Sequence, residues 1–152
     1  MKRIICLTVC ALMCLCSFVS CKEKEYDIDK GELAADLVAG GCFQDTLSEV
    51  PDSLLKYTYQ VEEGVSAVLY RGTNVTAEEI TVFEAADSTA AAAVLEVAKG
   101  YISTLAQTYD KYNAAEAARL RDAIIVQKGR YVIVCVCNDK AAAEKIIDEH
   151  CK

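Results

Sequence analysis

The feature that most constrains how this chain folds is an uninterrupted run of mostly apolar residues, Tyr131-Val-Ile-Val-Cys-Val-Cys137. Its β-branched and aromatic residues are typical of a strand rather than a helix. A second apolar run, Ala123 to Val126, precedes it, and Gly129 between the two supplies the positive φ that a tight turn needs. We therefore predict a β-hairpin whose second strand is the best-buried strand of the domain.

Helical spacing of apolar residues and the positions of capping residues predict the other elements. Asp29 precedes a helical pattern and is expected to cap it. Asp87 or Ser88 is expected to cap the long helix, and Asn138-Asp139 the last helix. The predicted helices lie within 29–40, 51–57, 88–109, 114–121 and 140–149, and two further strands are predicted over 65–70 and 79–85.

A weak internal similarity relates the segment from Ile80 to Val97 to the segment from Val132 to Glu149. Two interpretations are open: a hairpin–helix unit made twice, or two independent strand–Asp–helix segments that look alike. In either case we predict an α+β fold with a four-stranded, mainly antiparallel sheet and helices packed on one face.

The N-terminus has the pattern of a lipoprotein signal peptide over residues 1–20. Lys2 and Arg3 form a positive region, and an uncharged, largely apolar stretch follows. Phe18-Val-Ser-Cys21 fits a lipobox, although Phe18 stands where leucine is usual, so Cys21 is the predicted lipidation site. The alternative is an ordinary signal peptide cut nearby, but no Ala-x-Ala site supports it.

Removing residues 1–20 gives a net charge of 16 − 2 − 23 = −9. This charge argues against nucleic acid as a partner and predicts that the body stands off an anionic bilayer. We expect residues 21–31 to form the lipidated cysteine and a short charged tether, and residues 32–152 to form one α+β domain. The expected location is the extracytoplasmic face of a membrane.

A resemblance to known proteins rests on these residues: Val68-Leu-Tyr70, Ala77-Glu-Glu-Ile-Thr-Val-Phe83, Asp87, Tyr112, Glu116, Gly129-Arg-Tyr-Val-Ile-Val134 and Asp139. Through them the chain resembles a family of small lipoproteins from anaerobic Gram-positive bacteria, known only as a domain of unknown function. The resemblance covers roughly residues 30 to 150, and Ala114 departs from it where many relatives have proline. It implies a lipoprotein with an α+β fold, and no activity, ligand or catalytic residue.

Cys135 and Cys137 are the sharpest candidates for chemistry. On a strand both thiols point to one face, about 6.6 Å apart along the backbone, which is the far edge of disulfide reach. A strained bridge would suit a redox site, but the neighbours on this strand are apolar, and we favour core packing. A zinc site built from Cys135, Cys137, His150 and Cys151 has suitable ligand types but unsuitable spacing.

Other polar residues have simpler interpretations. Glu62-Glu63 and Glu78-Glu79 are expected on a solvated face or loop, because adjacent carboxylates do not converge on one atom. Tyr57, Tyr59 and Tyr70 are candidates for a partner surface. We therefore expect no catalytic residue, no metal and no cofactor.

The expected function is that of a lipid-anchored, non-catalytic binding or structural accessory at the cell envelope. Its partners would be the membrane, through Cys21, and an envelope protein. The alternative is a thiol-dependent redox or metal-binding protein that uses Cys135 and Cys137. A solute receptor of the two-lobed type is disfavoured, because one domain of this size cannot close around a ligand.

Overall fold

The computed structural model describes residues 24–73 and 75–152, so the predicted signal peptide and Cys21 lie outside the described residues. The described chain forms five helices and five strands. In chain order they are α2 (Lys30–Ala39), β1 (Ser48–Glu49), α3 (Asp52–Tyr59), β2 (Ser66–Arg71), β3 (Glu79–Glu84), α4 (Ser88–Tyr109), α5 (Ala114–Arg121), β4 (Ile124–Lys128), β5 (Tyr131–Val136) and α6 (Lys140–His150).

The strands form one antiparallel sheet of five strands in the order β1-β2-β3-β5-β4. The α+β class is confirmed, but the predicted count of four strands is wrong. The additional strand is β1, in which Ser48 pairs with Arg71 and Glu49 pairs with Tyr70. A strand of two exposed residues has no hydrophobic alternation, so nothing in its own sequence predicts it; β2 supplies the pairing.

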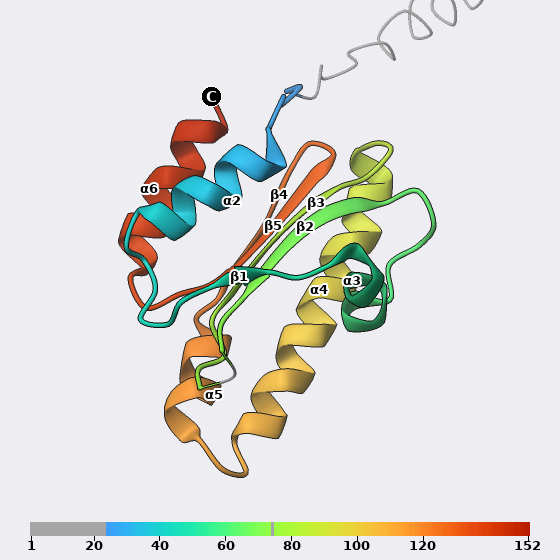
Figure 1. Cartoon of the computed structure of the whole chain (residues 1–152). Coiled ribbons are helices and arrows are strands. Elements are labelled where there is room, and N and C mark those ends of the chain that lie inside the picture. Colours follow the sequence, from blue (N-terminus) through green and yellow to red (C-terminus); the bar gives the residue numbers. More distant parts are fainter. Residues whose placement is uncertain (1–23, 74) are drawn as a thin grey trace, which may run out of the picture.

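Helices cover both faces of the sheet, not one (Figure 1). On one face, α2 and α6 pack over Ile80, Val82 and Ile133; on the other, α3, α4 and α5 pack over Phe83 and Val132. The prediction of a single covered face is therefore wrong. Every residue of β5 is buried, as an unbroken apolar strand requires, because its alternate side chains need apolar contacts on opposite sides.

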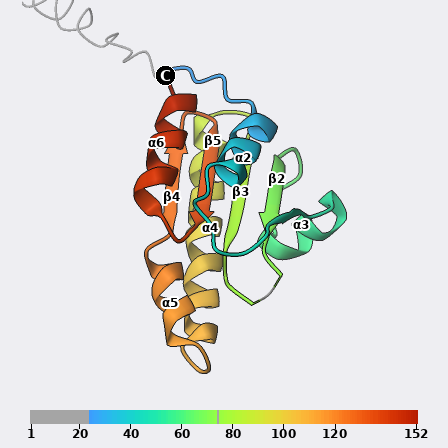
Figure 2. The ribbon, with the colours of Figure 1, turned by 60° about the vertical axis from the view of Figure 1, so that its left-hand side comes forward.

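The two similar segments form β3 followed by α4 and β5 followed by α6. Asp87 and Asp139 cap the two helices, accepting hydrogen bonds from the backbone N–H groups of Ala90 and Ala142. However, α4 and α6 lie on opposite faces of the sheet, as Figure 2 also shows. A twofold axis between two antiparallel strands would place both helices on the same face, so the repeated-unit prediction is not realised in three dimensions.

The hairpin prediction is confirmed. Residues Ile124–Lys128 pair with Tyr131–Cys135, and the turn is Gly129-Arg130. Gly129 has φ 56° and Arg130 has no positive φ, which is the pattern of a type II′ turn. β5 lies between β3 and β4 in the centre of the sheet, and its six residues are all buried.

The segment before α2 already packs on the domain. Ile28 is buried, and Asp29 accepts a hydrogen bond from the N–H of Glu32 at 2.9 Å, which caps α2 as predicted. Lys24 Nζ donates to the carbonyl of Cys151 at 3.3 Å, so the N-terminal segment lies beside the end of α6. In the part of the chain that the structure describes, no helix combines the length and the apolar character needed to cross a membrane.

Candidate functional site

The two predicted thiols differ in their surroundings. Cys135 is fully buried in the core between the sheet and α2 and α6, whereas Cys137 is half-buried just beyond the end of β5. The Cys135 thiol donates a hydrogen bond to Cys137. This hydrogen bond, and then burial, raise the pKa of Cys135, whereas the same hydrogen bond lowers the pKa of Cys137. Cys135 is therefore a core residue, and Cys137 is the more accessible thiol of the two.

The residues of the hypothetical zinc site are not brought together. His150 lies at the end of α6, where its Nε2 atom is 2.9 Å from Oδ2 of Asp36 on α2. Cys151 follows it and is buried, and Cys42 is a further buried thiol, whose carbonyl accepts from the N–H groups of residues 138 and 139. Within residues 24–73 and 75–152, no group of three His, Cys, Asp or Glu side chains is arranged to hold a metal ion.

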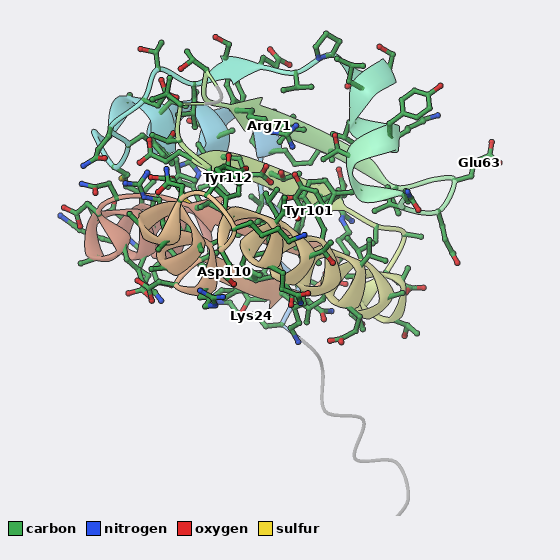
Figure 3. The ribbon with its side chains drawn as sticks, turned by 90° about the horizontal axis from the view of Figure 1, so that it is seen from below. Lys24, Glu63, Arg71, Tyr101, Asp110 and Tyr112 are labelled. Carbon is green, nitrogen blue, oxygen red and sulfur yellow. The ribbon has the colours of Figure 1, made fainter. Side chains whose placement is uncertain are left out.

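A buried carboxylate forms the most connected polar site, which we name the Glu79 cluster: Glu79, Tyr59, Arg71 and Tyr101. Glu79 is 1% exposed and lies on β3, and its side chain points toward α4. Its Oε1 atom accepts from the Tyr59 hydroxyl, and its Oε2 atom accepts from Arg71 Nε at 3.3 Å, from Arg71 Nη2 at 3.0 Å and from Tyr101 OH at 3.4 Å. Figure 3 shows Arg71 and Tyr101 next to each other between the sheet and α4.

Three elements besides β3 position this cluster. Arg71 is the last residue of β2 and lies directly across the ladder from Glu79, Tyr59 comes from α3, and Tyr101 comes from α4. The rings of Tyr59 and Tyr101 lie 4.3 Å apart and form part of the wall of a groove of about 400 Å³ between α3 and α4. The cluster therefore connects the sheet to two helices beneath a surface groove.

The electrostatics of the Glu79 cluster favour binding over proton transfer. Burial, and then the neighbouring charge of Glu79, raise the pKa of both Tyr59 and Tyr101, so both hydroxyls stay protonated near neutral pH. Burial by itself would lower the pKa of Arg71, but the attraction and hydrogen bond of Glu79, together with Tyr101 and Tyr59, raise it overall. The Arg71 side chain is 30% exposed, and its Nη1 atom makes no hydrogen bond with the described residues, so it can donate to a ligand.

A second buried set, the Glu78 cluster, joins α5 to the loop before β1. Glu78 accepts from the backbone N–H groups of Gln44 and Asp45, at 3.0 and 2.8 Å to Oε2. Arg119 Nη1 lies 3.4 Å from Glu78 and 3.1 Å from Glu116. Glu116 in turn accepts from the N–H of residue 77 at 2.7 Å. The Arg119 guanidinium thus contacts two buried carboxylates. One of them, Glu78, bonds the backbone of the loop before β1.

These clusters correct the prediction that Glu78 and Glu79 are solvated, since both are buried. Glu62 and Glu63 are exposed as predicted. A signal for Glu79 was present in the alternation of Glu79-Ile-Thr-Val-Phe83, which puts Glu79 on the same face as Phe83. The charge that neutralises it comes from the neighbouring strand, which sequence spacing did not reveal.

The surface of α3 has the largest apolar exposure near the edge of the sheet. Leu54 is 54% exposed and Tyr57 is 81% exposed, whereas Leu55 and Tyr59 on the opposite side of the helix are buried. The predicted partner surface of three tyrosines is therefore only partly present. Tyr57 is on the surface, Tyr59 belongs to the Glu79 cluster, and Tyr70 is half-buried against the other face of the sheet.

The fold and these clusters define a class: a three-layer α+β domain in which the buried carboxylates are hydrogen-bonded by the protein itself and an apolar helix surface stays exposed. The family DUF4358, a domain of unknown function, matches residues 42–137. That match spans well over half of the 152 residues, and the chain belongs to this family. No curated protein and no solved structure matches the chain.

Proposed function

We propose that this protein is a lipid-anchored, extracytoplasmic accessory of the cell envelope that works by binding a protein partner. The anchor would be Cys21, after removal of residues 1–20. The positive start, the uncharged stretch and the lipobox support this placement, as does the resemblance to small lipoproteins of anaerobic Gram-positive bacteria. Two or three acyl chains on one cysteine are enough for stable anchoring.

The observation that supports a binding role most strongly is the contrast between α3 and the buried clusters. The carboxylates of Glu78 and Glu79 have their hydrogen bonds from the protein itself. By contrast, Leu54 and Tyr57 expose large apolar surfaces to solvent on a short helix. Tyrosine is one of the residues that contribute most to binding at protein interfaces, and the apolar side chains around it exclude water.

The anchor is tested with Cys21→Ala. We expect this variant to accumulate as an unprocessed precursor or to appear in the medium, and to lose labelling by a radioactive fatty acid. A variant that stays membrane-bound at the mature mass would contradict the anchor. Cys6→Ala is the control, because this cysteine lies within the segment that is removed and its replacement should change neither processing nor labelling.

The binding surface is tested by cross-linking in the native envelope followed by mass spectrometry. We expect a specific cross-linked species that the double variant Leu54→Glu/Tyr57→Glu loses. Tyr112→Glu is a matched control, since Tyr112 is 68% exposed but lies after α4, away from α3. Equal loss with the control, or no loss with the α3 variant, would contradict this surface.

One observation favours the alternative of thiol chemistry. Cys137 is half-buried and accepts a hydrogen bond from Cys135, which lowers its pKa. Such a thiol reacts faster than an ordinary buried cysteine. If thiol chemistry is the function, the folded protein should exchange with a small aromatic disulfide at Cys137, and Cys137→Ser should abolish cellular function without lowering stability.

A further inference from the structure

The outer edge of β4 is an open edge of the sheet. β4 occupies the last position in the strand order, and its residues beyond Ile124 are only half-buried. The other edge is blunted, because β1 has only two residues. Open edges of this kind are commonly protected by proline, bulges or several charges. β4 has no proline, and Lys128 is its only charged residue.

The hydrogen-bond pattern of β5 fixes which backbone groups point outward from β4. The N–H of Ala85 donates to the carbonyl of Arg130 at 3.0 Å, so residues 130, 132, 134 and 136 bond toward β3. Residues 131, 133 and 135 therefore bond toward β4, where they pair with 128, 126 and 124. The N–H and C=O groups of Ile125 and Gln127 consequently point away from the sheet. Within residues 24–73 and 75–152 they have no hydrogen-bond partner.

We propose that β4 pairs with β4 of a second copy of this chain, antiparallel about a twofold axis at Val126. In this register Ile125 lies opposite Gln127 of the second copy, and the reverse, so the outward N–H and C=O groups of both residues bond reciprocally. Two sheets of five strands become one continuous sheet.

Charge complementarity identifies a second copy, rather than an unrelated strand, as the occupant. The same register places Asp122 opposite Arg130 of the second copy, at both ends of the paired strands. The Asp122 and Arg130 side chains are 71% and 45% exposed, respectively. Asp122 bonds Lys140 through Oδ1, and Arg130 bonds Glu84 and Tyr131 through Nη2. Oδ2 of Asp122 and Nη1 of Arg130 make no bond among the described residues, so both can reach across the twofold axis.

The association is a weak one, since pairing of five residues at an edge buries less surface than a permanent dimer needs. If the chain is lipid-anchored as proposed above, confinement to a membrane raises the local concentration of the two copies. The pairing itself depends only on the fold and is measurable with residues 22–152 in solution. A failure of the β4 pairing can therefore be distinguished from a failure of the lipid anchor.

The test is sedimentation velocity of residues 22–152 from micromolar to millimolar concentration. We expect a concentration-dependent monomer–dimer equilibrium for the wild type. Asp122→Arg and Arg130→Asp should each weaken the dimer roughly tenfold, because each variant places like charges opposite one another at two positions. An equimolar mixture of the two variants should associate as tightly as the wild type, because opposite charges face one another again only in the mixed dimer.

A backbone variant tests the pairing independently of charge. Gln127→Pro removes an outward N–H and leaves the backbone bonds to β5. Gln127→Ala is its control, because it loses only the side-chain bonds to the carbonyls of Ser88 and Gly129. The fold should be retained in both variants, and the dimer should be lost only in Gln127→Pro. Circular dichroism and thermal unfolding confirm the fold of each variant. A wild type that stays monomeric to millimolar concentration, a dimer that survives Gln127→Pro, or a mixture of charge variants that associates no better than either alone would overturn the proposal.

Discussion

Arg71 donates two hydrogen bonds to one carboxylate oxygen of Glu79, from Nε at 3.3 Å and from Nη2 at 3.0 Å. The two residues face each other across β2 and β3, and Glu79 is almost completely buried. Removing the cation beside a buried carboxylate destabilises the protein far more than removing one beside an exposed carboxylate, because water cannot replace the lost interaction. The ion pair therefore belongs to a cluster that connects β2 and β3 to α3 and α4.

Arg71→Met should lower the free energy of unfolding by about 3 kcal/mol or more, since it leaves Glu79 buried without its cation. Urea unfolding measures the change. Lys99→Met is the matched control, because Lys99 and its partner Glu96 are 50% and 72% exposed. We expect the control to cost less than about 1 kcal/mol. Equal effects of the two substitutions would contradict a buried role for the pair.

Acid should weaken the domain partly through Glu84. Hydrogen bonding to Lys30, the nearby charge of Lys30 and the contact with Arg130 lower the pKa of Glu84 below its unfolded-state value near 4.5. A carboxyl group with a lowered folded pKa stabilises the protein above the unfolded pKa, and this contribution disappears as the pH falls through the folded pKa.

Glu84→Gln should therefore reduce stability at neutral pH and have little effect at a pH well below the folded pKa of Glu84. The free energy of unfolding measured at both pH values checks this difference. Glu96→Gln, which removes a carboxylate on α4 that is 72% exposed, is the comparison and should reduce stability less than Glu84→Gln at neutral pH. A Glu84 variant whose cost is the same at both pH values would refute the assignment.

Thiol labelling should distinguish the four described cysteines. In the folded protein, iodoacetamide should modify Cys137, whereas Cys42, Cys135 and Cys151 should react only after unfolding. Cys135→Ala removes the hydrogen bond that lowers the pKa of Cys137, so Cys137 should then react more slowly at neutral pH. Peptide mapping by mass spectrometry follows each site. Faster labelling of Cys137 in this variant would contradict the direction of the hydrogen bond.

Two glycine substitutions should change the free energy of unfolding in opposite directions. Gly129→Ala should destabilise the domain by about 1 kcal/mol, because its φ of 56° is unfavourable for alanine and a Cβ would lie 3.2 Å from Cδ2 of Tyr26. Gly100→Ala should stabilise it by about 0.5–1 kcal/mol, since Gly100 lies inside α4 with no atom within 4 Å of a new Cβ. Thermal and urea unfolding measure both. A stabilising Gly129→Ala would refute the turn geometry.

Local structure was largely predictable from the sequence. The caps at Asp29, Asp87 and Asp139 and the hairpin turn at Gly129 are all present, because short-range hydrogen bonds and backbone sterics decide them within a few residues. Burial of the Tyr131–Cys137 strand was also predictable, since its side chains are nearly all apolar on both faces. A strand with apolar side chains on both faces also indicates that helices cover both faces of the sheet, contrary to the prediction of a single covered face.

Only the tertiary structure decided how these elements combine. The face that each helix covers depends on which side of the sheet the chain passes between one strand and the next. The β1 strand exists because β2 pairs with it. The charge that neutralises Glu79 comes from Arg71 on the neighbouring strand. The different burial of Cys135 and Cys137 likewise depends on which end of β5 emerges from the core. Each of these is a contact between residues distant in sequence, and a single sequence contains periodicity along the chain but no direct measure of proximity across it.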